Sequence, residues 1–469
     1  MEPRAPFRPL AAGLVVLTVL LGAGCTPVAT GVRGEPGAAG LRDPYFPKQG
    51  NGGYDVQRYD LTLGYDPATG RLDGTAEVTA RATQDLSAFH LDLHGLTVRE
   101  VTVDGRRPAA ANRAGDELTV RPRRDIHEGA RFRTVVRYTG VPATVTDADG
   151  SREGWLPLPG GGAVALGQPT GSAAWFPGNH HPSDKAAYEI TVTVPEGTDA
   201  VAGGERTAGR TRDGRTTTVW RSAEPMASYL ATLAIGELRV TTSRTASGLP
   251  VITAVDPASA GRAAGLLRRI PEFVEWCAAR FGPYPFSSAG AVVVPAGRVG
   301  YALETQTRPV FPLDAFDEET VVHEFAHQWF GNSVTPESWR DLWLSEGFAT
   351  YAEWLWLDDS GRTPVAKSFT AAYEDEANWA FPPAEPPGRE DLFAPPVYER
   401  SAMVLHRLRQ EVGDRAFFAI VRGWAAEHRH GNASTEEFTA YAQARAGGRD
   451  LGPLWGAWLY GDGRPPLAR

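Results

Sequence analysis

The chain has 469 residues, of which 42% are hydrophobic and 22% charged, and its formal net charge is −9. This length and composition are typical of a globular protein with about two domains and large cores. The acidic balance and the lack of a basic stripe argue against nucleic-acid binding. We expect a monomer.

Residues 1–24 are typical of an export signal. Two arginines precede an apolar run, residues 10–24, that is too short to span a bilayer comfortably. The run ends at Cys25 and resembles a bacterial lipoprotein signal, although Gly22 stands where an aliphatic residue is preferred. We therefore expect an exported protein that is lipid-anchored through Cys25 on the outer face of a bacterial cell membrane. Ordinary secretion is the alternative.

Two segments with different patterns follow the signal. Residues 25–43 are rich in Gly, Pro, Ala and Thr, which predicts a flexible tether. In residues 44–240 apolar and polar residues alternate, as at Tyr59, Leu61 and Leu63, and turn sequences separate the alternating runs. No long helical period interrupts them. We expect a mostly antiparallel β domain here.

The pattern changes in residues 241–469, which are predicted to form a mainly helical α+β domain. Apolar residues around Phe273 recur at helical spacing, and residues 291–294 form a short apolar strand. Further helices are predicted at residues 319–331, 343–357, 400–412, 414–428 and 435–446.

A metal-binding pattern lies in the first two of these helices. His323 and His327 flank Glu324 in a His-Glu-x-x-His string, so both imidazoles share one helix face and can converge on one zinc ion. Glu346 lies in a mostly apolar segment, where an acid is costly unless it is paired or metal-bound. Two histidines and a glutamate leave one position open for water, which is typical of catalytic zinc. An accidental string in a helix is the alternative.

The same residues predict a hydrolytic chemistry. Zinc lowers the pKa of its water to about 7, and Glu324 stands where a general base could take the proton and pass it to a leaving amine. The tetrahedral intermediate then needs a further donor, because one zinc ion cannot neutralise its charge alone.

The motif resembles the aminopeptidase N family of gluzincin metallopeptidases. Glu346 follows His327 after eighteen residues, and Trp-Phe-Gly-Asn at 329–332 and Leu-Trp-Leu at 342–344 also match. Segments around residues 168, 175–177, 187–190 and 226–230 resemble the family's β domain. The resemblance implies a β domain packed on a thermolysin-like α+β catalytic domain, and one Zn²⁺ per chain. It makes His323, His327 and Glu346 the metal ligands and Glu324 the base.

Three further residues take roles from this resemblance. Tyr398 matches a tyrosine whose neutral hydroxyl donates to the oxyanion, with Tyr301 and Tyr351 as rival candidates. Glu304 matches a glutamate that holds the substrate's free amine, although Tyr301 replaces the glycine of that motif. Gln168 matches a second amine contact from the β domain. Alternatively, Tyr398 is a packing residue, Glu304 a solvated surface acid and Gln168 an ordinary loop amide.

These observations predict a zinc aminopeptidase that hydrolyses the first peptide bond of peptides. Family members often carry a large helical C-terminal domain over the active site, and without it we expect a more open cleft. A zinc endopeptidase or another zinc hydrolase using the same site is the first alternative. A non-catalytic surface-binding protein on the same scaffold is the second, and the complete set of site residues argues against it.

Overall fold

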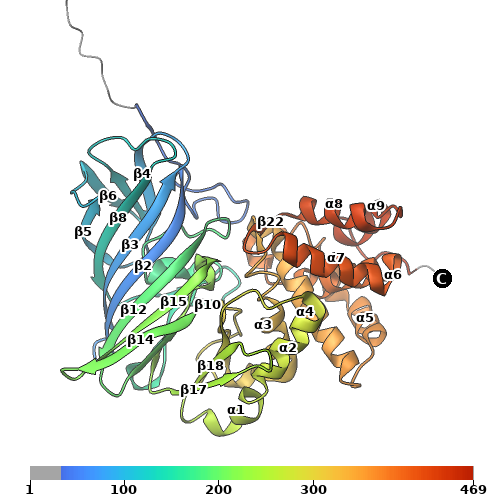
Figure 1. The fold of residues 1–469 in the computed structure, drawn as a ribbon. Coiled ribbons are helices and arrows are strands. Elements are labelled where there is room, and N and C mark those ends of the chain that lie inside the picture. Colours follow the sequence, from blue (N-terminus) through green and yellow to red (C-terminus); the bar gives the residue numbers. More distant parts are fainter. Residues whose placement is uncertain (1–32, 468–469) are drawn as a thin grey trace, which may run out of the picture. The chain divides into compact units, whose positions relative to one another are not determined.

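The computed structural model describes residues 33–467. The predicted signal segment, residues 1–24, and Cys25 lie outside the described residues. Along the described chain a β-rich domain is followed by a mainly helical domain (Figure 1). This order confirms the predicted fold class.

The largest sheet of the β domain has seven strands. Long strands form because every second residue is apolar and buried, as along β2. All neighbours are antiparallel except the parallel pair of β12 with β2. In spatial order the strands are β14 (Glu205–Arg212), β15 (Arg215–Ala227), β12 (Lys185–Pro195), β2 (Tyr54–Asp66), β3 (Arg71–Ala82), β8 (Arg131–Gly140) and β5 (Thr97–Val103).

Two smaller sheets complete this domain. One contains β1 (Glu35–Pro36), β4 (Leu86–Asp92), β7 (Glu117–Arg121) and β6 (Ala110–Ala114) in that order. The other contains β13 (Asp199–Ala202), β16 (Leu233–Gly236), β11 (Ala163–Leu166), β10 (Arg152–Pro157) and β9 (Thr144–Thr146). The second sheet bears on function, because it carries Gln168 just after β11 and a hairpin turn between β9 and β10.

The segment predicted to be a flexible tether is folded where it is described. Strand β1 pairs in parallel with β4, and the Asp43 side chain is buried. Its carboxylate accepts hydrogen bonds from Ser338 Oγ at 2.7 Å and from the Trp339 N–H at 3.0 Å. The tether prediction for residues 25–43 is therefore wrong from residue 33 onward, because these hydrogen bonds fix the segment. Its earlier part lies outside the described residues.

The second domain is built on a mixed sheet. Its strands are β17 (Arg239–Arg244), β18 (Pro250–Val255), β19 (Ala289–Val294) and β20 (Val310–Pro312). β19 is buried throughout and contains the apolar strand predicted at residues 291–294. Because β17 pairs with β18, this sheet begins two residues before the predicted domain boundary. A short ladder joins β21 (Thr335–Pro336) to β22 (Asn432–Ala433).

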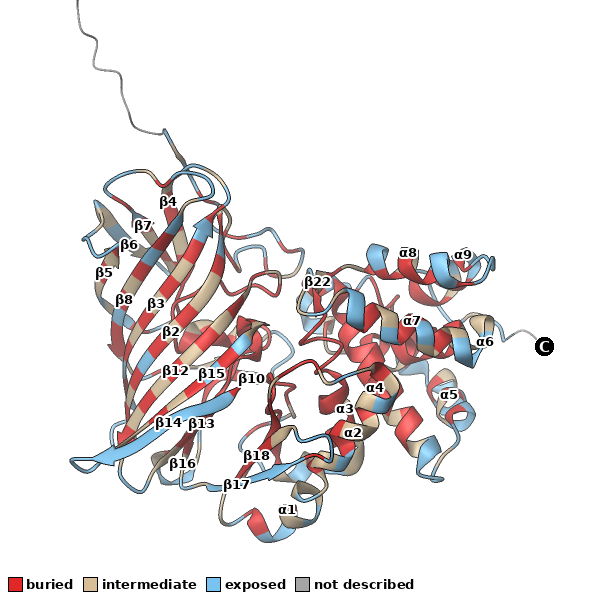
Figure 2. Cartoon of the chain, in the orientation of Figure 1, coloured by how far each residue is buried: buried red, intermediate tan, exposed pale blue. Residues whose placement is uncertain are grey.

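Helices make up most of the rest of the domain, and the first two of them pack on this sheet. They are α1 (Ala260–Leu267), α2 (Ile270–Phe281), α3 (Glu318–Ala326), α4 (Trp343–Asp359), α5 (Val365–Glu374), α6 (Ser401–Val412), α7 (Asp414–Glu427), α8 (Thr435–Arg445) and α9 (Gly452–Leu454). Helix α4 is buried along most of its length, whereas β14 is exposed throughout (Figure 2).

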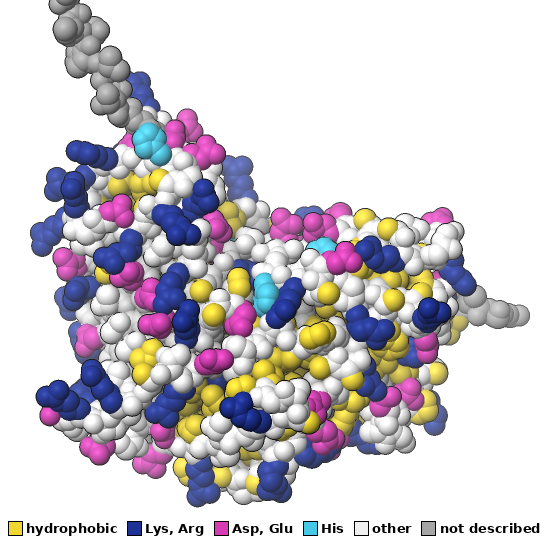
Figure 3. Space-filling view, viewed as in Figure 1, with side chains coloured by type: hydrophobic (Ala, Val, Ile, Leu, Met, Phe, Trp, Pro, Cys, Tyr) yellow, Lys and Arg dark blue, Asp and Glu magenta, His cyan; other side chains and the backbone are white. Residues whose placement is uncertain are grey.

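The surface combines both charges. On the face drawn in Figure 3, Lys and Arg side chains lie among Asp and Glu side chains. None of the helices between residues 33 and 467 has the length and apolarity that a membrane crossing requires.

Candidate active site

Two packed helices, α3 and α4, carry the predicted metal ligands. Helix α3 begins after Asp317, whose carboxylate caps it by accepting from the Thr320 N–H at 2.9 Å. It ends at Ala326, with His327 as its C-cap, whereas the sequence predicted an end at residue 331. Hydrogen-bonded turns continue to Phe330, and the chain then leaves the helical path at Gly331, where φ is +122°. A Cβ at Gly331 would stand 2.4 Å from Ser345 Oγ, so the turn brings the two helices into close contact.

The three predicted ligands converge. Glu346 Oε2 lies 3.3 Å from His323 Nε2 and 3.3 Å from His327 Nε2. A tetrahedral zinc ion with bonds of about 2.0–2.1 Å requires ligand atoms about 3.4 Å apart. All three side chains have little exposure to solvent. The residues present therefore fit a zinc ion in both donor type and spacing.

The outer nitrogens of both imidazoles also have partners. His323 Nδ1 lies 2.5 Å from Glu353 Oε1, and His327 Nδ1 lies 3.0 Å from Ser345 Oγ. Such contacts fix the ring orientation and keep the proton on Nδ1, which leaves Nε2 free to bind metal. Glu353 was not among the site residues predicted from the sequence. Helical periodicity could have identified it, because Glu353 lies seven residues after Glu346 and therefore on the same face of α4.

Glu324 is buried beside the ligands without a fixed partner. Its Oε2 accepts no hydrogen bond from any of the described residues. Burial raises the pKa of Glu324, while the His323 and His327 imidazoles oppose that shift. An unpaired carboxylate oxygen next to a metal site is suited to accept a proton from water.

A second set of ligand atoms borders the same space. Oxygens of Glu304 and Glu324 and a nitrogen of His327 lie within 4.8 Å of one another. The two sets share His327, so they surround one space. The set that contains Glu346 is the better metal site, because its carboxylate oxygen is equally close to two imidazole nitrogens.

Glu304 meets Gln168 at the edge of this space. Gln168 Nε2, from the β domain, donates to Glu304 Oε1 at 3.0 Å, and both side chains are buried. Backbone hydrogen bonds between Leu303 and Val310 hold the Glu304 segment against β20. Burial raises the pKa of the Glu304 carboxyl. The structure therefore brings together the two residues predicted to contact a substrate amine.

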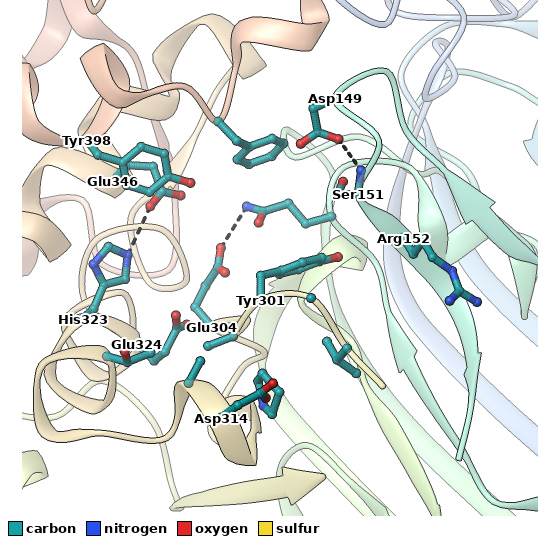
Figure 4. Close-up of a pocket in the computed structure, with 18 of the residues that line it drawn as sticks. Asp149, Ser151, Arg152, Tyr301, Glu304, Asp314, His323, Glu324, Glu346 and Tyr398 are labelled. Atoms are coloured by element: carbon teal, nitrogen blue, oxygen red, sulfur yellow. Dashed lines mark hydrogen bonds and ion pairs between the residues drawn. The ribbon is translucent and has the colours of Figure 1, made fainter. Parts of the chain in front are cut away.

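Only one of the three candidate tyrosines stands beside the ligands. The Tyr398 ring stacks on the His323 ring with centroids 6.2 Å apart. Tyr351 is absent from the lining of the cavity and its hydroxyl instead meets His406 Nδ1 at 3.2 Å. Tyr301 lines the cavity, but its hydroxyl points away from His323 and Glu346 (Figure 4).

The Tyr398 segment is a π-helical turn, residues Pro396–Arg400, that leads into α6. It is fixed by the buried Arg400 guanidinium, which donates to the carbonyl oxygens of Trp458 and Phe381 at 3.0 Å each. Burial raises the pKa of Tyr398, so its hydroxyl stays protonated and can donate.

Both halves of the chain match family models. The Peptidase M1 N-terminal domain matches residues 56–230, and the Peptidase family M1 domain matches residues 315–458. An M1 zinc metallopeptidase from Deinococcus radiodurans, solved with a Tyr-Ser-Ala substrate, has a similar structure with a TM-score of 0.84 and 30% identity. That match covers 91% of this chain and 99% of the Deinococcus chain. The chain belongs to the M1 peptidase family.

Other M1 proteins support this assignment, although this chain covers less than half of two longer relatives. A two-domain M1 zinc metallopeptidase with bound L-arginine matches at a TM-score of 0.83 and 29% identity, over 91% of this chain and 99% of that one. Human endoplasmic reticulum aminopeptidase 1 is 25% identical over 81% of this chain, and aminopeptidase N of Streptomyces lividans is 27% identical over 61%. The chain spans 44% and 36% of the lengths of these two relatives. The family resemblance seen in the zinc motif is confirmed.

The cavity of this M1 peptidase is large and acidic. Its volume is about 940 Å³, and both domains line it. The sequence did not predict that the β9–β10 turn would line this cavity, nor that residues 297–300 would (Figure 4). A divalent cation and a substrate ammonium would together offset most of the acidic charge. The charged lining residues are Asp149, Arg152, Arg298, Glu304, Asp314, Glu324, Glu346 and Glu353.

Proposed function

We propose that this chain is a zinc aminopeptidase that hydrolyses the first peptide bond of peptides with a free N-terminus. The observation that carries the proposal is the buried Glu304 carboxylate, held by Gln168 on the border of the metal site. A carboxylate there can pair with an α-ammonium and so align the first peptide bond with the metal.

The residues around the metal site supply the remaining steps. A zinc ion bound by His323, His327 and Glu346 would provide Lewis acidity, which polarises the scissile carbonyl and lowers the pKa of a water. Glu324 accepts the proton of the attacking water and returns it to the leaving amine. The Tyr398 hydroxyl donates a hydrogen bond to the oxyanion.

Glu304 and Gln168 select substrates by their free N-terminal amine. Burial raises the pKa of Glu304, and an arriving ammonium favours its ionised form, so binding of the amine and ionisation of the acid reinforce each other. The Gln168 amide holds one carboxylate oxygen, which leaves the other for the amine. The tripeptide bound to the Deinococcus relative supports peptides as the substrate class.

A paired substrate experiment tests the proposal. The purified zinc-loaded chain is given one panel of peptides with a free N-terminus and the same panel N-acetylated. We expect cleavage of the first bond in the free panel and a loss of kcat/KM of at least about a hundredfold on acetylation. Equal cleavage of both panels would favour the endopeptidase alternative and would remove Glu304 as an amine anchor.

We further propose that the protein is exported and lipid-anchored through Cys25. The support is the apolar run at residues 10–24 that ends at this cysteine. Cells that express the full chain are fed radiolabelled palmitate, with Cys25→Ser as the matched control. Label on the wild-type chain alone is the expected result. An unlabelled wild-type chain in the culture medium would instead indicate ordinary secretion.

A further inference from the structure

Lys185, the first residue of β12, does not line the cavity but contacts the segment that follows the zinc-binding helix α3. Its Nζ donates to the carbonyl oxygens of Asn332 at 3.0 Å, Ser333 at 2.9 Å and Gly431 at 3.1 Å. No carboxylate within residues 33–467 forms a salt bridge with it. The three donors of one ammonium group from the β domain thus meet three backbone acceptors of the catalytic domain.

Asn332 connects this contact to the proposed active site. Its side-chain Nδ2 donates to the Glu304 carbonyl oxygen at 2.7 Å, and its backbone N–H donates to the His327 carbonyl at 2.9 Å. Asn332 is fully buried, so its orientation depends on its own hydrogen bonds. The remaining backbone group of Asn332, its carbonyl, accepts from the Lys185 ammonium and from Thr335 Oγ1, each at 3.0 Å. The Glu304 carbonyl accepts a second hydrogen bond from Gln328 Nε2 at 3.2 Å. Lys185 therefore supplies the charged contact to Asn332 and the one that comes from the β domain.

We propose that Lys185 is a positioning residue that locks the Glu304 main chain against the zinc-binding helix through Asn332. The β domain then reaches the amine anchor twice, at its carboxylate through Gln168 and at its backbone through Lys185. The inference rests on the proposed role of Glu304. Its consequence is that the charge of Lys185 supports selectivity for a free amine rather than metal binding.

The chemistry of the site supports a role beyond packing. Burial lowers the pKa of Lys185 to about 7, so keeping it charged costs free energy that its three hydrogen bonds must offset. A methionine of similar length would avoid that cost and would lose the carbonyl contacts. After the change the Asn332 and Gly431 carbonyls still accept from Thr335 Oγ1 and the Thr335 N–H, both at 3.0 Å. Lys185→Met should therefore fold while holding Asn332 less firmly.

The test compares two zinc-binding inhibitors, L-tyrosine hydroxamate and N-acetyl-L-tyrosine hydroxamate, which differ only in the free amine. The ratio of their inhibition constants measures the amine preference. For Lys185→Met we expect this ratio to fall about tenfold, with unchanged affinity for the acetylated inhibitor and unchanged zinc content. Lys185→Arg should restore part of the ratio because it keeps the charge.

Two further variants separate positioning from general domain contact. Asn332→Ala should lower the ratio to a similar extent, and the double variant with Lys185→Met should add little, since both act on one path. The matched control is Asn432→Ala, which removes a neighbouring contact from Asn432 Nδ2 to the Pro182 carbonyl at 2.8 Å but leaves Asn332 untouched. It should keep the wild-type ratio.

The outcomes are distinct. If the wild-type enzyme itself shows no amine preference, the proposed function fails. If the wild type shows the preference and Lys185→Met keeps it, or if Asn432→Ala lowers it equally, the positioning role of Lys185 is overturned. Should Lys185→Met not fold, Lys185→Gln takes its place, because it removes the charge and keeps a polar side chain. A lowered ratio in Lys185→Gln supports the positioning role, and a wild-type ratio overturns it.

Discussion

At the scale of single residues, Glu324 is the clearest test of the chemistry. Its carboxylate is buried with one unpaired oxygen beside the ligands, but it is not among the three converging ligand atoms. Glu324→Gln should therefore keep zinc and lower kcat by about a thousandfold, because the amide cannot accept the proton. Zinc content by mass spectrometry and single-turnover kinetics measure the two effects.

Glu319 provides the matched control for this substitution. It lies on the same helix, and its carboxylate pairs with Arg362 near the surface. Glu319→Gln should leave both zinc content and kcat within about twofold of wild type. A Glu324→Gln enzyme that turned over normally would show that another group takes the proton.

Substitution of Glu353 should change the affinity for zinc rather than the proton transfer. Its carboxylate holds His323 Nδ1 at 2.5 Å, so Glu353→Gln should weaken zinc binding about 10- to 100-fold by loosening the ring and lowering its basicity. Competition against a chelator measures the affinity. Asp358→Asn, an exposed change near the end of α4, is the control and should bind zinc as the wild type does. Equal affinity in both variants would leave Glu353 with no part in holding the metal.

The site shows which residues a sequence can reveal. His323, His327 and Glu346 could be predicted because helical spacing and an acid in an apolar segment are local signals. Glu353 obeys the same periodicity and was missed because a lone acid on a helix is usually solvated. The contact of Gln168 with Glu304 spans 136 positions and depends on how the two domains pack. No local sequence pattern can predict a contact between residues so far apart in the chain.

At the scale of elements, the boundaries of strands and helices were predictable where the pattern was periodic. Helix α4 was expected at 343–357 and spans Trp343–Asp359, because its apolar residues run without interruption. Helix α3 was predicted too long, since the turn after it depends on the close approach of Gly331 to Ser345. Residues 33–43 were predicted as tether because their composition is that of a linker, and tertiary hydrogen bonds overrode it.

Asp43, in that segment, should make the stability of the fold depend on pH. Burial alone would raise the pKa of Asp43, but hydrogen bonds from His181, Ser338 and the Tyr45 and Trp339 N–H groups outweigh it and lower the pKa to about 2. Because the pKa of Asp43 is lower in the folded state than its unfolded value of 3.8, the carboxylate stabilises the fold at pH values above 3.8. This stabilisation is lost as the pH falls toward 2.

The corresponding variant is Asp43→Asn. At pH 7 it should lower the free energy of unfolding by about 2 kcal/mol, and the difference from wild type should shrink steadily below about pH 4. Urea midpoints at several pH values give the comparison. Asp213→Asn, at the exposed turn between β14 and β15, should have no measurable effect. A loss that did not vary with pH would mean that packing, rather than charge, fixes the segment.

At the scale of the whole molecule, the two domains are joined by buried polar contacts that surround the site. Gln168 reaches Glu304, Lys185 reaches the turn after α3, and Arg308 Nη2 donates to the Gly204 carbonyl at 2.6 Å. These contacts lose their partners if one domain unfolds alone, and unpaired buried polar groups are costly. The described domains should therefore unfold together, although all three proposed zinc ligands belong to the catalytic domain.

Zinc removal tests this coupling. Because zinc binds only the folded site, free zinc at a thousand times its Kd should add about 4 kcal/mol to the free energy of unfolding. Chelation should lower the melting temperature of one single transition, and added zinc should restore it. His327→Ala, which removes a proposed ligand, should melt at the same temperature with or without zinc. Two separate transitions, of which zinc moved only one, would show that the β domain folds independently of the site it helps to form.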